Sequence, residues 1–352
     1  MRLHVTRNRK RPDRSLCLSL LVVSVVLSSC VQEDQIGSSV LFSGQTMGTT
    51  YTVKVREMPE DVLLTSLREG IDQILERVNS RMSTYREDSE ISLFNQSTST
   101  DWSKISPETV RVINEALRVS NLTNGAFDVT VAPLVNMWGF GPAPKTIEIP
   151  SQDIIKERLP SVGYRHLHTQ SSPPAIRKDQ PNLQIDLSAI AKGYAVDQVA
   201  EYLESLSIPH FLVEIGGELR GKGHNSTGFP WKVAIEKPAS GERTIHRVLY
   251  LQSHAMATSG DYRNFFEKNG QRFTHTINPQ TGQPVTHQLA SVTVVRASCM
   301  EADALATGLM VLGPEEGYIL AVQEKLPVLF VSRTQRGFEE IMTPELEPFL
   351  RS

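Results

Sequence analysis

The sequence has little cysteine. Only three cysteines occur in 352 residues. Cys17 lies in an N-terminal apolar run that we expect to be removed, and the position of Cys30 predicts that it is lipidated, so Cys299 is left alone. No intrachain disulfide can then form. A hydrophobic core must therefore stabilise the fold, and the chain is long enough to build one, as one large domain or two closely joined lobes.

An excess of basic residues is absent as well. The chain has 36 Lys and Arg against 39 Asp and Glu, and from residue 30 onward the balance is 30 against 38, a net charge near −8. A surface of that sign gives no electrostatic reason to bind nucleic acid, so we expect no nucleic-acid partner.

Several catalytic motifs are also missing. The sequence contains no P-loop, no GxGxxG dinucleotide fingerprint, no HExxH zinc helix and no GxSxG nucleophile elbow. It has no cluster of cysteine or histidine, and this makes zinc and iron poor candidates. Carboxylate, hydroxyl and carbonyl oxygens instead suit Mg²⁺ or another hard cation.

The first thirty residues are typical of an exported lipoprotein. A basic segment precedes an apolar run, LCLSLLVVSVVLSSC, which is too short to span a membrane as a stable helix. The run ends in Leu27-Ser28-Ser29-Cys30, which is similar to a bacterial lipobox with Cys30 as the lipidated residue. We predict a signal peptide at 1–29, a lipidated end and tether at 30–40, and a folded domain at 41–352. Lipid chains would hold that domain at a membrane.

Strand and helix patterns are mixed along the rest of the chain without strict alternation, which favours an α+β fold over a doubly wound parallel sheet. Period-two and turn patterns predict a hairpin, a pair of short strands, one strand leading into a glycine turn, and further single strands. These cover 40–57, 166–188, 210–223, 231–238, 246–260, 289–298 and, as the last strand, 327–333. Helical spacing and start signals predict helices at 62–85, 106–123, 150–160, 189–208, 300–313 and 314–326.

One predicted helix carries an unexpected polar pair. Asp303 and Thr307 lie four residues apart in the apolar stretch EADALATGLMVLG, so both side chains share one face. One interpretation is an N-terminal charge and a threonine that hydrogen-bonds back to its own helix. The other is a site for a hard cation.

Three further segments hold polar residues with two possible roles. Asp128, beside Phe127 in GAFD, either belongs to a turn that enters a strand or accepts hydrogen bonds from a ligand next to a flat ring. Lys192, in the first turns of the helix that follows Asp186, is either a solvated residue or a partner for phosphate oxygens at the helix N-terminus.

The third segment is a hairpin, predicted between residues 258 and 285 with its tip at 268–270. Pairing of its strands would bring Asp261 and His275 to the same end. His275 is then either a structural histidine or a base or substrate contact.

Eight segments, taken in order, resemble blocks of the ApbE family of flavin transferases, the FAD:protein FMN transferases. They extend from about Phe42 to Gly313, and together they are far more specific than any one of them alone. The segments are MGTTY, MSTYREDSEISLFN, GAFDVTVAPLVNMWGFG, IDLSAIAKGYAVD, EIGGELRGKG, ATSGDYRNFF, HTINPQTGQPV and EADALATGLMVLG.

The resemblance implies an α+β fold with a T-fold-like core, built from mixed or antiparallel sheets with packed helices. It implies that Asp303, Thr307 and a backbone oxygen near Ala189 bind Mg²⁺. It also implies a set of residues that bind FAD, namely Met47, Tyr85, Ala126, Phe127, Asp128, Asp186, Lys192, Thr276 and Ile277.

The implied reaction is Mg²⁺-dependent transfer of FMN from FAD to a threonine hydroxyl of an acceptor flavoprotein, through a phosphoester bond and with release of AMP. Either His275 or Asp261 would remove the hydroxyl proton, and His275 is preferred. The acceptor would be an extracytoplasmic segment, such as a subunit of a quinone reductase or of an electron-transfer complex.

Two alternative functions stay open. With water in place of threonine, the site would be an FAD pyrophosphatase that gives FMN and AMP. A lipid-anchored flavin-binding protein without catalysis is the other alternative, although holding a ring and a ribose requires no phosphate-bridging cation. Family habit favours the periplasmic side of the inner membrane, and Val31 after Cys30 leaves the outer membrane open as a destination.

Overall fold

The structure, a computed structural model, describes residues 39–142, 148–238, 244–262, 264–268 and 270–351. The predicted signal peptide, Cys30 and nearly all of the predicted tether lie outside the described residues. Contacts between Cα atoms group Glu33–Ser352 into one unit.

An antiparallel sheet of eight strands forms the centre of this unit, in the order β1-β2-β6-β7-β10-β13-β14-β15. The strands are β1 (Ser39–Thr46), β2 (Thr49–Arg56), β6 (His210–Ile215), β7 (Glu218–Lys222), β10 (Ser253–Gly260), β13 (Leu289–Arg296), β14 (Val328–Thr334) and β15 (Gly337–Met342).

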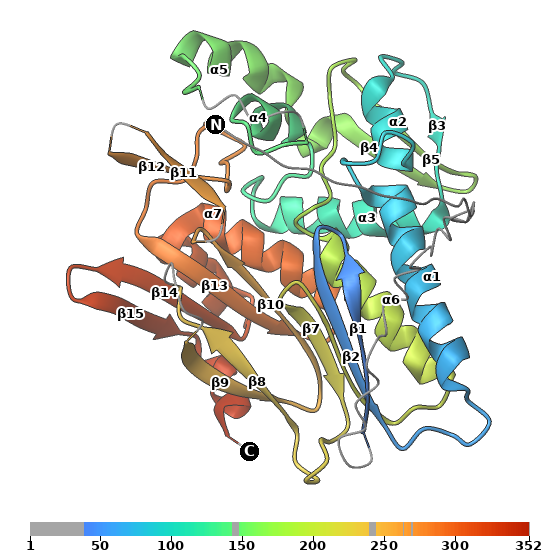
Figure 1. Cartoon of the computed structure of the whole chain (residues 1–352). Coiled ribbons are helices and arrows are strands. Elements are labelled where there is room, and N and C mark those ends of the chain that lie inside the picture. The colour runs from blue at the N-terminus through green and yellow to red at the C-terminus, as the bar shows by residue number, and fades with distance from the viewer. Residues whose placement is uncertain (1–38, 143–147, 239–243, 263, 269, 352) are drawn as a thin grey trace, which may run out of the picture. The chain divides into compact units, whose positions relative to one another are not determined.

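The sheet is covered on both faces. Three helices lie against one face (Figure 1), namely α1 (Leu64–Met82), α6 (Ala191–Ser205) and α7 (Cys299–Gln323). The hairpin of β8 (Trp231–Glu236) and β9 (Ile245–Leu251) packs on the other face. Because successive side chains of a strand point to opposite faces, β14 serves both cores. Val328 and Phe330 join the helix-side core, while Leu329 and Val331 join the core under β8 and β9.

The smaller elements surround one end of this sandwich. A three-stranded sheet of β3 (Ser103–Lys104), β5 (Pro174–Lys178) and β4 (Leu167–Ser171) lies near α2 (Glu90–Gln96) and α3 (Pro107–Leu122). A third apolar cluster joins α4 (Ala132–Met137) and α5 (Gln152–Arg158) to the hairpin of β11 (Phe265–Lys268) and β12 (Gln271–Thr274).

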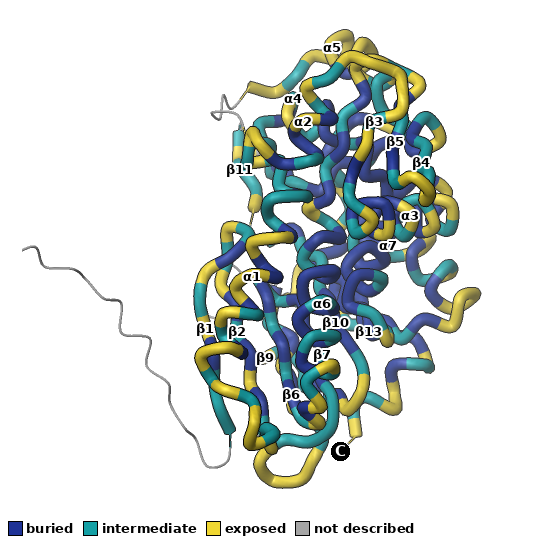
Figure 2. Tube along the Cα trace, turned by 90° about the vertical axis from the view of Figure 1, so that its right-hand side faces the viewer, coloured by how far each residue is buried: buried dark blue, intermediate teal, exposed yellow. Residues whose placement is uncertain are grey.

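Helix α7 is buried over most of its first part, from Cys299 to Val311, whereas Ile319 and Val322 in its last part are exposed. It contacts β10, β13 and α6, and Figure 2 shows it within the most deeply buried part of the trace. By length and composition α7 could also cross a membrane, but a buried core helix meets the same criterion. The backbone leaves helical geometry at Gly313 (φ 84°), just before Pro314, so the predicted break between two helices is confirmed.

The α+β class is confirmed, and the predicted helices and hairpins are present. Three strand predictions were wrong in detail. Segment 210–223 folds as two strands, β6 and β7, around Gly216-Gly217, and segment 246–260 divides into β9 and β10, which lie in different sheets. Strand 327–333 is not the last, since β15 pairs with it. Helices α2 and α4 were not predicted, because each is shorter than two full turns and leaves little periodic signal.

Candidate active site

A cavity of about 520 Å³ opens between the helix layer and the elements around α4 and β11–β12. It gathers all but two of the residues that the sequence nominated for catalysis, FAD binding or metal binding. The nominated residues that line it are Tyr85, Ala126, Phe127, Asp128, Asp186, Ala189, Lys192, His275, Thr276, Ile277, Asp303 and Thr307.

Met47 and Asp261 are the two that do not line this cavity. Met47 occupies the β1–β2 turn with a positive φ of 50° and packs half-buried against the main core. Asp261 is 4% exposed, and both of its carboxylate oxygens accept hydrogen bonds from the guanidinium of Arg333 on β14. A carboxylate held in this two-pronged way is poorly placed to accept a proton from a substrate.

The starts of α6 and α7 approach each other closely at the cavity. The backbone N–H of Gly193 donates to Asp303 Oδ2 at 3.0 Å. A Cβ added at Gly193 would lie 2.3 Å from the carbonyl oxygen of Cys299, so only a glycine allows this approach. Asp303 is 5% exposed, and burial raises the pKa of its carboxyl.

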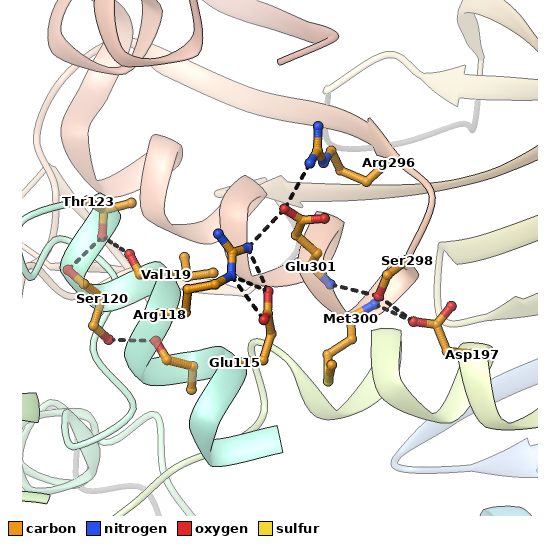
Figure 3. A network of polar contacts seen from close by, with 11 residues as sticks. Glu115, Arg118, Val119, Ser120, Thr123, Asp197, Arg296, Ser298, Met300 and Glu301 are labelled. Carbon is orange, nitrogen blue, oxygen red and sulfur yellow. Dashed lines mark hydrogen bonds and ion pairs between the residues drawn. The ribbon is translucent and has the colours of Figure 1, made fainter. Parts of the chain in front are cut away.

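A polar network fixes the beginning of α7 (Figure 3). The carboxylate of Asp197, on α6, accepts hydrogen bonds from the backbone N–H groups of Cys299 and Met300 at 3.0 Å each and from the Ser298 hydroxyl at 2.7 Å. These bonds satisfy N–H groups that a helix start otherwise leaves free, and the negative charge complements the helix dipole. Asp303 lies one turn further on, so its position depends on this anchor.

The same network extends to α3. Glu301, in the first turn of α7, pairs with Arg118 of α3 at 2.9 Å and with Arg296 of β13 at 3.0 Å, and Arg118 also pairs with Glu115. Helix α7 is therefore tied to α3, α6 and β13 within its first turn.

Asp303 and Thr307 both face the cavity from α7, and Ala189 faces it from the loop before α6. Elsewhere in the protein the hydroxyls of Ser120 and Thr123 do bond back to carbonyls four residues earlier. Among the described residues Thr307 makes no such side-chain bond, which argues against the back-bonded interpretation of the pair. The described part of the chain has no group of three or more His, Cys, Asp and Glu side chains suited to a metal. A cation here would need hydroxyl and carbonyl oxygens beside the carboxylate, as Mg²⁺ accepts.

Lys192 lies between two buried carboxylates. Its Nζ is 2.8 Å from Oε1 of Glu218, the first residue of β7, and 3.8 Å from Oδ1 of Asp303. Burial lowers the pKa of Lys192, but the two carboxylates outweigh burial, so its pKa is raised and the side chain is charged. Burial raises the pKa of Glu218, and Lys192 opposes that shift. The sequence did not nominate Glu218, since it stands in a strand pattern with only the preceding glycine pair as a signal.

The loop that carries Asp186 is held from two sides. The Asn95 side chain donates to the carbonyl of Ile185 at 2.8 Å and accepts from its N–H at 2.7 Å. Lys178, which is fully buried, donates to the carbonyl of Leu183 at 3.0 Å. The side chain of Asp186 accepts from the Ser188 N–H. Asp186 and the following Ala189 are therefore presented to the cavity by a rigid segment.

Tyr85 and Asp128 differ in how free their polar groups are. Tyr85 is 70% exposed, and burial of part of its ring, followed by the charge of Asp186, raises its pKa. Asp128 is 7% exposed, and its oxygens accept from the N–H and hydroxyl of Thr130 and from the N–H of Tyr164. The Asp128 carboxylate therefore organises its own loop, as the turn interpretation expects, and Asp128 also lines the cavity beside Ala126 and Phe127.

His275 is the one histidine that lines the cavity, as far as the described residues show. Its Nδ1 lies 2.9 Å from the carbonyl oxygen of Asn264. A carbonyl can only accept, so Nδ1 carries the proton and Nε2 keeps a free lone pair. Burial lowers the pKa of His275, which keeps the ring neutral at neutral pH. The neutral ring can therefore accept a proton at Nε2.

Other cavity residues were not nominated from the sequence. They come from β6, the β6–β7 turn, β8, β10 and the segment after β10. They include Glu214, Gly216, Gly217, Ala234, Glu236, Thr258, Ser259, Tyr262 and Asn264. Residues 258–264 lie in the predicted hairpin segment, but of these only Asp261 was given a role.

Comparison with known proteins identifies the group to which this arrangement belongs. The model of the ApbE family matches residues 47–330. The chain is 45% identical over 333 residues to the FAD:protein FMN transferase of Vibrio cholerae serotype O1, with 95% of this chain and 98% of that protein covered. It is 37% identical over 342 residues to the enzyme of that name from Escherichia coli K12, with 95% and 97% covered.

Solved structures agree with these relatives. The flavin transferase ApbE from Vibrio cholerae superposes with a TM-score of 0.82 at 46% identity and covers 89% of this chain and 99% of its own. The ApbE protein from Thermotoga maritima superposes with a TM-score of 0.81 at 27% identity, covering 89% and 100%. The resemblance inferred from the eight segments is confirmed, and the chain belongs to the ApbE family.

Proposed function

We propose that this chain is an FAD:protein FMN transferase that uses Mg²⁺ to transfer FMN from FAD to a threonine hydroxyl of an acceptor flavoprotein and releases AMP. The family and the names of its relatives support flavin transfer. The single observation that supports the finer reaction is the shared cavity. It places the Asp303–Thr307 pair, the Lys192 ammonium and the neutral His275 around one space.

The donors of the cavity fit a magnesium ion. Asp303 supplies a carboxylate, Thr307 a hydroxyl without another side-chain bond among the described residues, and Ala189 a backbone carbonyl, all oxygen ligands. When bound there, Mg²⁺ would supply charge neutralisation for the pyrophosphate oxygens. Lys192 would bind phosphate oxygens from the start of α6, where backbone N–H groups also favour an anion.

The transfer requires one bond to form and one to break. The threonine oxygen attacks the phosphorus of the FMN half of FAD, the P–O bond to the AMP half breaks, and AMP leaves with the electron pair. His275 accepts the hydroxyl proton at Nε2, since Nδ1–H is held by the carbonyl of Asn264. The other chain residues act by positioning, which is the main demand of phosphoryl transfer. Phe127 and Ile277 supply apolar walls for the flavin ring.

The test uses the full chain purified in detergent, with FAD and Mg²⁺ present. The acceptor is a quinone reductase subunit that carries the target threonine, and its matched control is the same subunit with that threonine replaced by alanine. Covalent flavin fluorescence of the acceptor on a denaturing gel supports transfer. Release of AMP without labelling would mean that hydrolysis is the activity, and unchanged FAD would mean simple flavin binding.

Asp303→Ala should abolish labelling, because the site loses its only nominated carboxylate ligand for the cation. Circular dichroism should show a folded variant, since the remaining anchors of α7 at Asp197 and Glu301 stay in place. Asp303→Asn is the matched variant of equal size. Full labelling by Asp303→Ala, or labelling that survives a chelator, would contradict the metal assignment.

The location is part of the proposal. Lipidation of Cys30 would hold the domain on the periplasmic side of the inner membrane, where an extracytoplasmic acceptor segment is accessible. The mass of the N-terminal peptide and membrane fractionation of a Cys30→Ser variant test this. A variant that stays with the inner-membrane fraction would contradict anchoring through Cys30.

A further inference from the structure

Three charged side chains meet at one wall of the cavity, and their pairing is unequal. Lys192 could pair with either Glu218 or Asp303, yet its ammonium lies 2.8 Å from Glu218 and 3.8 Å from Asp303. The other oxygen of Asp303 accepts from the N–H of Gly193. Among the described residues no third carboxylate lies within ion-pair distance of Lys192, so Glu218 alone competes with Asp303 for it.

The position of Glu218 is fixed by the turn before it and by its burial. The turn before it has positive φ values at Gly216 (65°) and Gly217 (111°), which L side chains rarely adopt. The carboxylate is 4% exposed and lines the cavity. Its second oxygen, Oε2, is buried and has no hydrogen-bond partner among the described residues. A buried carboxylate with an unused oxygen is costly, and such a group needs a reason beyond packing.

The charges explain what Glu218 does for Asp303. The 2.8 Å contact with the Lys192 ammonium favours the ionised form of Glu218 over the neutral form that burial favours. In the ionised form, one ammonium and two carboxylates give the cluster a net charge of −1, which favours a divalent cation. Without the Glu218 charge, Lys192 and Asp303 would form a neutral pair. The ammonium, freed from Glu218, could then close the 3.8 Å gap to Asp303. A cation would have to displace it from the carboxylate.

We propose that Glu218 is a positioning residue that holds the Lys192 ammonium away from Asp303 and so keeps Asp303 available to a divalent cation. This role rests on the proposed metal site, and Glu218 itself need not touch the metal. Partners of this indirect kind commonly change metal affinity ten- to hundredfold when removed, which sets the size of the expected effect at roughly that range.

The test measures cation binding without FAD, so that it does not depend on turnover. Mn²⁺ binding to the full chain in detergent is followed by electron paramagnetic resonance, and Mg²⁺ competition gives the affinity for Mg²⁺. Glu218→Gln should weaken binding by roughly ten- to hundredfold. Glu204→Gln is the matched control, because Glu204 lies on the same helix as Lys192 but pairs with Arg220 and Lys222. It should bind as the wild type does.

A double variant distinguishes a positioning role of Glu218 from direct binding of the cation by Glu218. In Lys192→Met/Glu218→Gln the cluster again has a net charge of −1 and no ammonium that can reach Asp303. Affinity should therefore return to within a few-fold of the wild type, although Glu218 is still missing. If Glu218 were itself a ligand, the double variant would bind as weakly as Glu218→Gln, and that result would overturn the proposed role.

The remaining outcomes distinguish this role from the metal site on which it rests. Unchanged affinity in Glu218→Gln, together with weak binding by Asp303→Ala, overturns the role of Glu218 and leaves the metal site intact. Equal binding by wild type and Asp303→Ala overturns the metal site and the role of Glu218 with it.

Discussion

The close approach of α6 and α7 can be tested by adding a single methyl group at Gly193. Gly193→Ala would add a Cβ at 2.3 Å from the carbonyl oxygen of Cys299 and 2.8 Å from the Cα of Met300. Both neighbours are backbone atoms of α7, and α7 is tied to α3, α6 and β13 at this turn. No rotation of a side chain can relieve the overlap, so the two helices must separate.

The expected cost follows from the distances. To reach ordinary contact the separation must grow from 2.3 Å to 3.4 Å, that is by about 1.1 Å. An equal displacement would break the 3.0 Å hydrogen bond from Gly193 to Asp303. Overpacking costs about 1–3 kcal/mol, and a lost bond to a charged group costs about 1.5–3 kcal/mol. Alanine has a higher helix propensity than glycine, which offsets up to about 1 kcal/mol of this cost. The free energy of unfolding should therefore fall by about 1.5–5 kcal/mol.

Urea unfolding monitored by circular dichroism measures the effect, and Gly70→Ala is the matched control. Gly70 also lies inside a helix, α1, and its added Cβ would lie 2.2 Å from the Tyr202 hydroxyl. That hydroxyl is the far end of a side chain whose hydrogen bond, to the Ser66 carbonyl at 3.4 Å, is long. The ring carbons Cζ and Cε1 of Tyr202 also lie 2.4 Å and 2.7 Å from the added Cβ, and the ring packs half-buried against the main core. Rotation of this one side chain can relieve the overlap without moving a helix, so Gly70→Ala should cost less stability than Gly193→Ala. Equal stability of the two variants would refute the reasoning.

Two further predictions concern the proton acceptor. His275→Asn should lower kcat/KM for transfer by about 10²–10⁴-fold without changing Mn²⁺ affinity. In the wild type, kcat/KM should fall only as the pH drops through the lowered pKa of His275, below the ordinary histidine value of about 6.5. If kcat/KM of His275→Asn still falls in that pH range, His275 is not the group that titrates. Asp261→Asn should lower the free energy of unfolding by about 2–4 kcal/mol, because it leaves the Arg333 guanidinium without its carboxylate partner. In Asp261→Asn the kcat/KM for transfer should still fall at low pH as it does in the wild type. If that decrease disappears, Asp261 is the base.

Local features of the fold were predictable because their causes are local. The Ser106 side chain caps α3 as its start signal predicted, accepting from the N–H of Thr109. The break at Gly313 and the hairpin of β1 and β2 follow from glycine, proline and period-two patterns. Short helices such as α4 were not predictable, since they depend on packing. The division of 210–223 into two strands was missed although its Gly216-Gly217 pair is a local turn signal.

The sequence by itself determined that α7 is apolar and carries Asp303 and Thr307 on one face, and that its oxygens suit a hard cation. Only the tertiary structure decided which charges meet. Gly193 and Asp303 are 110 residues apart in the chain, and Asp261 and Arg333 are 72 apart. It removed Asp261 from the cavity by pairing it with Arg333, and it brought Glu218 to Lys192. An ion pair depends on distance in space, and local pattern contains no information on the distance between residues so far apart in the chain.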